Sequence, residues 1–279
     1  MSRRLVALAL PVFALVAMAA RKPDDPKHEN HFKGASAPTS DVLSFALVAA
    51  HAQAEFVLID AKITNTTGDR LLLFKKNEAS LVLPQGAMPV KAGGLFGGPM
   101  VIPPNDTRSH TFRVEADAGL HVDRVTLQPK GFYVGSNTGT PLKAPEFQLP
   151  ASANDFTTGP FTCKLNNVKQ ETKETAAAFA CTYNGAGVGI VEPKKIGVRE
   201  PGGKEFANAA RKVPRDVLLP GDTSKFTVIF EIPASVVDMQ FATLQVLWRD
   251  ALAESTLAPV ALADWAFELD AAKTAEANK

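Results

Sequence analysis

Residues 102–115 read IPPNDTRSHTFRVE, and residues 218–231 read LLPGDTSKFTVIFE. Each stretch contains a proline, a tight turn that ends in Asp-Thr, and then an alternating run that ends in glutamate. Asp106 and Asp222 are 116 residues apart, which is the size of a β-sandwich domain of roughly 100 residues. The match therefore predicts a duplicated all-β domain. It does not indicate a solenoid, because solenoid repeats are much shorter.

The alternation predicts strands that bury one face, because successive side chains of a strand point to opposite sides. We expect Asp106 and Asp222 to accept hydrogen bonds from backbone N–H groups of their turns. His110 takes the inward position that Phe226 holds in the second copy; we expect a hydrogen-bonded histidine at the rim of the sandwich, with a pH-sensing role as the alternative. The expected inward sets are His110, Phe112 and Val114, and Phe226, Val228 and Phe230.

Upstream of these turns, each copy has a further matching stretch, at residues 55–68 and 177–185. Each is a strand that runs into an asparagine and glycine turn, where these residues tolerate positive φ. Long segments with helical periodicity are lacking, and the best helical candidate, residues 207–212, is brief. The predicted organisation is a signal peptide (1–19), a flexible leader (20–40), two β-sandwich domains (41–150 and 155–270) and a polar tail (271–279).

The first 20 residues read MSRRLVALALPVFALVAMAA. Two arginines precede an apolar run of 16 residues, and Ala17-Met18-Ala19 has the pattern that a signal peptidase recognises. The run is shorter than the roughly 20 apolar residues that span a bilayer. We therefore expect cleavage after Ala19 and a bacterial protein that is exported to the periplasm or the exterior, with an uncleaved N-terminal anchor as the alternative. No transmembrane segment is expected in the mature chain.

The composition is that of a folded protein, with 279 residues of which 46% are hydrophobic and 21% charged. It excludes collagen, a disordered chain and a disulfide-dense small scaffold. Removal of the two arginines of the signal leaves 28 basic and 29 acidic residues, a formal net charge of −1. A nucleic-acid partner is not expected, because proteins that bind nucleic acid through bulk charge carry a cationic excess.

The two cysteines of the chain, Cys163 and Cys181, lie on two strand-like runs at residues 161–165 and 179–183. If these runs pair antiparallel, the two sulfur atoms face each other. In an exported protein we expect a structural disulfide; two free buried thiols are the alternative. A metal site is poorly supported, since two cysteines without a nearby histidine supply half of the ligands at most. No cofactor is predicted.

Residues 159–250 show a first strand, a longer strand that ends at Asn184, the turn Leu219-Pro220-Gly221-Asp222 and a Phe-x-Val strand. This order resembles the immunoglobulin-like domains of unknown function in bacterial exported proteins and lipoproteins. The first copy resembles them more loosely, with Pro-Asn-Asp in the turn. The resemblance implies sandwiches of about seven strands and no known catalytic residues. The chain departs from that family in its cysteine pair and in the lack of a lipid-anchor cysteine.

The remaining motifs give weaker indications. Residues 91–100 are rich in glycine but lack the Lys-Ser/Thr ending of a P-loop. We interpret them as a flexible connection between strands with an exposed Leu95-Phe96 tip; contact of this tip with a partner or a membrane surface is the alternative. His28 and His31 could hold copper or zinc on an ordered segment, although we expect this segment to be disordered. His51 and His121 are expected to stand alone. Trp248 and Trp265 are expected to pack in the core or at an edge.

These observations predict a non-enzymatic, exported binding or assembly module of the cell envelope, with an envelope or extracellular protein as its partner. The contacts are expected at loops at the ends of the sandwiches, above all in the insertion at residues 84–101. The alternative is a hydrolase, or an accessory domain of an envelope enzyme, with an unrecognised site. A weak periplasmic metal carrier that uses His28 and His31 is a third reading.

Overall fold

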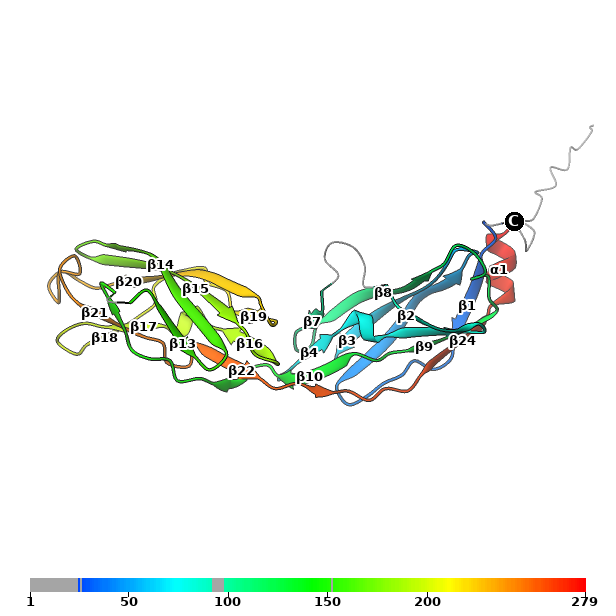
Figure 1. Cartoon of the computed structure of the whole chain (residues 1–279), viewed down its shortest axis with the longest axis horizontal. Coiled ribbons are helices and arrows are strands. Elements are labelled where there is room, and N and C mark those ends of the chain that lie inside the picture. Colours follow the sequence, from blue (N-terminus) through cyan, green and yellow to red (C-terminus); the bar gives the residue numbers. More distant parts are fainter. Residues whose placement is uncertain (1–24, 26, 92–97, 152) are drawn as a thin grey trace, which may run out of the picture.

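The computed structural model describes residues 25, 27–91, 98–151 and 153–279. The expected signal peptide and the Leu95-Phe96 tip lie outside these residues. The described chain is all-β apart from two short 3-10 turns (Lys76–Glu78 and Pro193–Lys195) and one helix, α1 (Ala271–Ala277). Its buried hydrophobic residues form two separate cores. We call the elements around them the first unit and the second unit; Figure 1 shows them at opposite ends of the molecule.

The first unit consists of an eight-stranded sheet and a four-stranded sheet that face each other across the first core. The larger sheet has the order β6-β5-β9-β24-β1-β2-β3-β8, and the smaller one has the order β23-β10-β4-β7. The bounds are β1 (Asn30–Gly34), β2 (Leu43–Ala52), β3 (Phe56–Asn65), β4 (Arg70–Phe74), β5 (Ser80–Leu83), β6 (Gly86–Pro89), β7 (Met100–Ile102), β8 (Thr107–Glu115), β9 (Arg124–Gln128), β10 (Phe132–Ser136), β23 (Ala258–Pro259) and β24 (Trp265–Leu269).

The second unit contains three four-stranded sheets around the second core. Their orders are β13-β14-β15-β20, β12-β21-β17-β18 and β11-β22-β16-β19. The bounds are β11 (Thr140–Pro141), β12 (Phe147–Leu149), β13 (Asp155–Thr158), β14 (Phe161–Gln170), β15 (Glu174–Tyr183), β16 (Val188–Val191), β17 (Gly197–Arg199), β18 (Glu205–Ala207), β19 (Asp216–Leu218), β20 (Thr223–Glu231), β21 (Leu244–Leu247) and β22 (Leu252–Ser255).

The two units repeat the same three neighbouring strands, β2-β3-β8 and β14-β15-β20. The matching strands have equal lengths, and both hairpins carry a β-bulge, at Val48 in β2 and at Asn166 in β14. In the turns before β8 and β20, positive φ falls on Asn105 and on Gly221. These residues adopt that conformation with little strain. The same three-strand pattern, with its bulge and its turn, is therefore present in both units.

The expected inward faces of β8 and β20 are buried except at His110, which is half-buried. Phe112, Val114, Val228 and Phe230 are fully buried, and Phe226 is nearly so. The two turn carboxylates also act as expected: Asp106 Oδ1 accepts from the N–H of Thr107 at 2.8 Å, and Asp222 Oδ2 accepts from the N–H of Leu219 at 2.9 Å.

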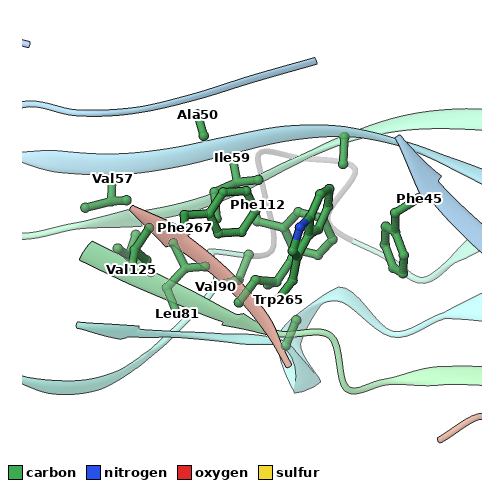
Figure 2. Close-up of a cluster of buried hydrophobic side chains, with 14 of the residues drawn as sticks. Phe45, Ala50, Val57, Ile59, Leu81, Val90, Phe112, Val125, Trp265 and Phe267 are labelled. Carbon is green, nitrogen blue, oxygen red and sulfur yellow. The ribbon is translucent and has the colours of Figure 1, made fainter. Parts of the chain in front are cut away.

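The end of the chain belongs to the first unit, which corrects the expected domain boundary at residues 155–270. β24 pairs with β1 and with β9, and its Trp265 and Phe267 are buried in the first core beside Phe45, Ile59 and Phe112, as Figure 2 shows. The second unit is thus inserted in the first, between β10 and β23. The physical reason is that β9 and β1 do not pair with each other. β24, the strand that follows the second unit, lies between them and completes the sheet.

The leader predicted to be flexible contains β1, which pairs with β2 as well as with β24. The tail forms α1, and Asp270 caps its start by accepting from the N–H of Lys273 at 3.2 Å. Asn278 then ties the helix to β1, because its side chain bonds the N–H and C=O of Glu29. Residues 207–212, the best helical candidate in the sequence, leave β18 without forming a helix.

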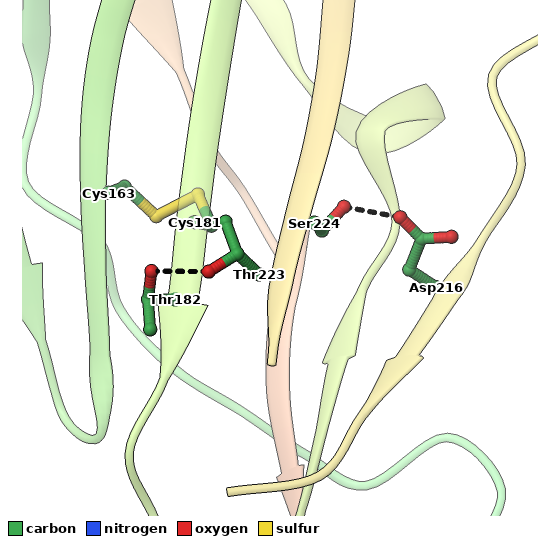
Figure 3. The surroundings of a disulfide bond; sticks show 6 residues. All are labelled: Cys163, Cys181, Thr182, Asp216, Thr223 and Ser224. Atoms are coloured by element: carbon green, nitrogen blue, oxygen red, sulfur yellow. Dashed lines mark hydrogen bonds between the residues drawn. A yellow bond between two sulfur atoms is a disulfide. The ribbon is translucent and has the colours of Figure 1, made fainter. Parts of the chain in front are cut away.

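Cys163 and Cys181 form a disulfide between directly opposite residues of β14 and β15 (Figure 3). Both are completely buried in the second core. The equivalent cross-strand pair of the first unit is Phe45 and Ile63, so the disulfide occupies a position that apolar side chains fill in the other copy. No helix of the described residues is long and apolar enough to cross a membrane.

Candidate functional site

β8 leaves one side of its backbone open. It is the last strand of its sheet and, within the described chain, pairs only with β3. The carbonyl of Asp106 accepts a bond from the end of β3, whereas that of Arg113 accepts one from the N–H of Lys91 on the far side, at 2.8 Å. Backbone direction alternates along a strand, so the N–H and C=O groups of Ser109 and Thr111 face away from the sheet.

β20 repeats this arrangement in the second unit. The carbonyl of Asp222 accepts a bond at 3.0 Å from the end of β15, and that of Ile229 accepts one at 2.7 Å from the N–H of Ala209 on the open side. Lys225 and Thr227 therefore direct their backbone groups outward, and β20 has no second partner strand in the described part of the chain. Such an edge is a template for pairing with another chain.

A hollow lies against each of these edges. The first measures about 510 Å³ and the second about 520 Å³. Both reach from the bulge of the first hairpin strand, across the second, to the edge strand. The lining residues include equivalent positions: Val48, Asp60, Ala61, Ser109, His110 and Thr111 in the first unit, and Asn166, Ala178, Phe179, Lys225, Phe226 and Thr227 in the second.

His110 is half-buried in the first hollow, with its ring against Phe74 and Phe112 at centroid distances of 5.1 and 4.7 Å. Its Nε2 is shielded from solvent and finds no hydrogen-bond partner among the described residues. Burial, with a smaller contribution from Lys76, lowers the pKa of this imidazole to about 4. The hydrogen bond expected for this histidine is therefore not made by Nε2.

Replacing His110 by Phe, the residue at the matching position, is expected to stabilise the first unit most at low pH. In the unfolded chain the imidazole binds a proton below about pH 6.5, whereas in the fold it stays neutral down to about pH 4. Wild type is therefore penalised increasingly as pH falls from 6.5 to 4. Because the ring is only half-buried, we expect His110→Phe to gain about 2 kcal/mol more at pH 4.5 than at pH 7.5. Urea unfolding at the two pH values measures this, and an equal gain at both would contradict it.

The two hollows differ in charge. The second is lined by Arg211, Lys212 and Lys225, and by no acidic residue. All three side chains are exposed, and none has an ion pair with another described residue. The first is lined by three lysines and Asp60, and one of these lysines, Lys91, pairs with Glu115. In a chain that is close to neutral overall, the second hollow is thus a local concentration of unneutralised positive charge.

A third hollow of about 450 Å³ beside β21 shows the contrasting case. Its two arginines share one carboxylate: Glu205 lies 2.8 Å from Nη2 of Arg199 and 2.6 Å from Nη2 of Arg249. The pKa of Glu205 is lowered by these two hydrogen bonds. Because both arginines are already paired with a carboxylate of the chain, and Glu146 and Asp250 also line this hollow, it offers little attraction to an anionic ligand.

Four histidines of the first unit, all except His110, lie in two pairs near β1, contrary to the expectation that His51 and His121 stand alone. His28 is buried, and its Nδ1 lies 2.7 Å from Nε2 of His121. The rings of His31 and His51 stack with centroids 5.6 Å apart. Nevertheless, no group of three or more His, Cys, Asp or Glu side chains in the described residues is arranged to hold a metal ion.

Two other expectations have clear outcomes. Trp248 and Trp265 are both buried in the cores, as expected. The insertion at residues 84–101, expected to supply the contact loop of the first domain, contributes β6, which pairs with β5. Sequence reasoning also missed Phe241, which is 82% exposed on the connection between β20 and β21. The connection between these strands, residues 232–243, is mostly apolar (IPASVVDMQFAT), so nothing in the sequence indicated that this side chain is exposed.

Comparison with known proteins does not extend these observations. No protein-family model matches the chain, and no curated protein sequence matches it.

Proposed function

We propose that the protein is a non-enzymatic, exported protein of the bacterial cell envelope that binds another envelope or extracellular protein. In this proposal its two units are immunoglobulin-like sandwiches, the second inserted in the first. The signal-like N-terminus, the buried disulfide and the duplicated strand pattern support it. The binding surface differs from the expected loop tip: it is the edge strand of each unit together with the adjoining hollow.

One observation carries the proposal, namely that an open strand edge and a hollow occur at equivalent positions in both units although the residues that line them differ. Proteins usually protect an exposed edge by covering, shortening or bulging it. Here both edge strands are nine residues long and regular. An added strand gains main-chain hydrogen bonds from such an edge, and the adjoining hollow selects its side chains.

Prolines at the two open edges test the proposal. Thr111→Pro with Thr227→Pro removes one outward N–H from each edge and leaves the inward ladder intact, since proline is tolerated where the N–H faces outward. We expect capture of a specific envelope protein by the wild-type chain and at least about tenfold weaker capture by the double variant. The matched control, Thr111→Ala with Thr227→Ala, keeps both N–H groups and should capture normally.

Two results would contradict the proposal. One is equal capture by the proline variant after circular dichroism has shown that it folds. The other is reproducible turnover of a glycan, peptide or ester substrate that a single substitution abolishes, because this would establish the hydrolase alternative.

A further inference from the structure

We propose that the edge of β20 binds an extended, acidic segment of the partner protein, which joins the sheet as an additional strand and places its carboxylates against Arg211, Lys212 and Lys225. This inference rests on the proposed function and specifies the chemistry of the partner. It concerns β20 rather than β8.

The backbone supplies the first part of the argument. Lys225 and Thr227 present their N–H and C=O groups outward, while Ile229 is already engaged by Ala209 and by the side chain of Asn208, each through one hydrogen bond. From Asn208 and Ala209 the chain moves away from the edge of β20, and residues 210–214 line the hollow before β19 begins. The open edge at Lys225 and Thr227 thus faces residues 210–214, which form the opposite wall of the hollow and include two cations, Arg211 and Lys212.

Charge supplies the second part. Arg211 and Lys212 stand on the wall and Lys225 on the strand, so a chain between them meets positive charge from both sides. Cations close together repel one another, and this repulsion is relieved when carboxylates are placed between them. A lysine on an edge strand often serves only to prevent aggregation. That role does not account for Arg211 and Lys212, which are not on the strand.

The same charges argue against two other occupants. A second copy of the chain that paired β20 with β20 would bring both sets of cations together, which disfavours self-association. A basic segment would need negative charge in the hollow, and its lining has none. A nucleic acid would need a broad cationic surface, whereas the chain is nearly neutral. The β8 edge has Asp60 in its hollow and Glu115 paired to Lys91, so it does not share the preference for acid.

The test uses a synthetic heptapeptide that alternates valine and glutamate, acetylated and amidated at its ends, with the full chain. A lysine-for-glutamate peptide is the first control. A second control has proline in place of the central valine. We expect the acidic peptide to shift the amide NMR signals of Lys225 and Thr227, to bind more weakly at about 0.5 M salt, and to bind at least about tenfold more tightly than either control.

Charge reversal away from the edge strand separates the electrostatic contribution from the fold. Arg211→Glu with Lys212→Glu should weaken binding of the acidic peptide at least about tenfold. The matched control, Lys130→Glu with Lys173→Glu, changes the net charge equally at exposed lysines outside the hollow and should bind as wild type does.

Equal affinity of the acidic and lysine peptides, or undiminished binding by the Arg211 and Lys212 variant, would overturn the inference. Shifts confined to β8 would also overturn it. The proposed function is tested separately, because it requires only that the prolines at Thr111 and Thr227 weaken capture of an envelope protein at least about tenfold. Capture that is lost with the prolines but unaffected by Arg211→Glu with Lys212→Glu would retain the binding role and refute the acidic segment.

Discussion

Trp265→Ala is expected to destabilise the first unit by about 4 kcal/mol, the usual cost of truncating a fully buried tryptophan. Trp265 is buried, packs against Phe45 and Phe267 at centroid distances of 5.8 and 4.8 Å, and donates a hydrogen bond from Nε1 to the carbonyl of Ala35 at 3.0 Å. The substitution therefore leaves both a cavity and an unpaired carbonyl. A loss of this size is a large fraction of the stability of one domain.

The two tryptophans make the effect measurable unit by unit, because Trp248 is buried in the second core. In Trp265→Ala the remaining emission reports on the second unit, and its urea midpoint should equal that of wild type. Hydrogen exchange should show lost protection in β3 and retained protection in β15. A matched variant, Trp248→Ala, should give the reverse pattern, with the emission of Trp265 unchanged.

A different outcome would assign the last strands to the second unit. If Trp265→Ala lowered the midpoint of the Trp248 emission and left the exchange of β3 unchanged, the pairing of β24 with β1 and β9 would be wrong. The contrast is sharp, because residues 258–269 follow the second unit directly along the chain.

Much of the fold could be predicted because it is local. The burial of Phe112 and Val228 follows from alternation within single strands, and the turns at Asp106 and Asp222 follow from residues that are adjacent in sequence. The disulfide required one further step, namely that two neighbouring runs pair as a hairpin. Each of these inferences involves strands that are close together along the chain.

The closure of the first unit involves strands that are far apart. Nevertheless, a sequence signal existed: residues 140–149 read TPLKAPEFQL and residues 258–267 read APVALADWAF. In the structure, the first stretch forms β11 and β12 and the second forms β23 and β24, which pair with the corresponding strands β22, β21, β10 and β9. One copy of the repeat therefore begins near residue 140, and the matching stretch of the other copy begins near residue 258. In the sequence, only the spacing of 118 residues between these two stretches indicates the repeat.

The candidate site depends on the open edges of β8 and β20, which have no second neighbouring strand among the described residues. A sequence pattern does not indicate which strands lie at the edge of a sheet. Alternation in β20 predicts which side chains are buried, but it does not show that Lys225 and Thr227 lack a neighbouring strand. The bulges at Val48 and Asn166 likewise arise from pairing register. Arg211 and Lys212 are 13 or more residues from Lys225 along the chain, and only the fold brings them into one hollow.

Removing the disulfide by Cys163→Ala with Cys181→Ala is expected to destabilise the second unit by about 3 kcal/mol, in the chain-entropy estimate for a loop of this length. The sequence separation is 18 residues. The urea midpoint of the Trp248 emission should fall and that of the Trp265 emission should stay. Because both sulfur atoms are fully buried, reductant without denaturant should leave the wild-type bond intact until the second unit opens.

The first unit provides the control, since Phe45 and Ile63 hold the equivalent cross-strand positions without a covalent bond. Phe45→Ala should cost the first unit about 3–5 kcal/mol through loss of packing, and reductant should have no effect on it. In the second unit, by contrast, the double alanine variant and the reduced wild type should unfold at similar urea concentrations. If reduction left the Trp248 midpoint unchanged, packing would hold this position in both copies, and the covalent bond would contribute nothing to the stability of the second unit.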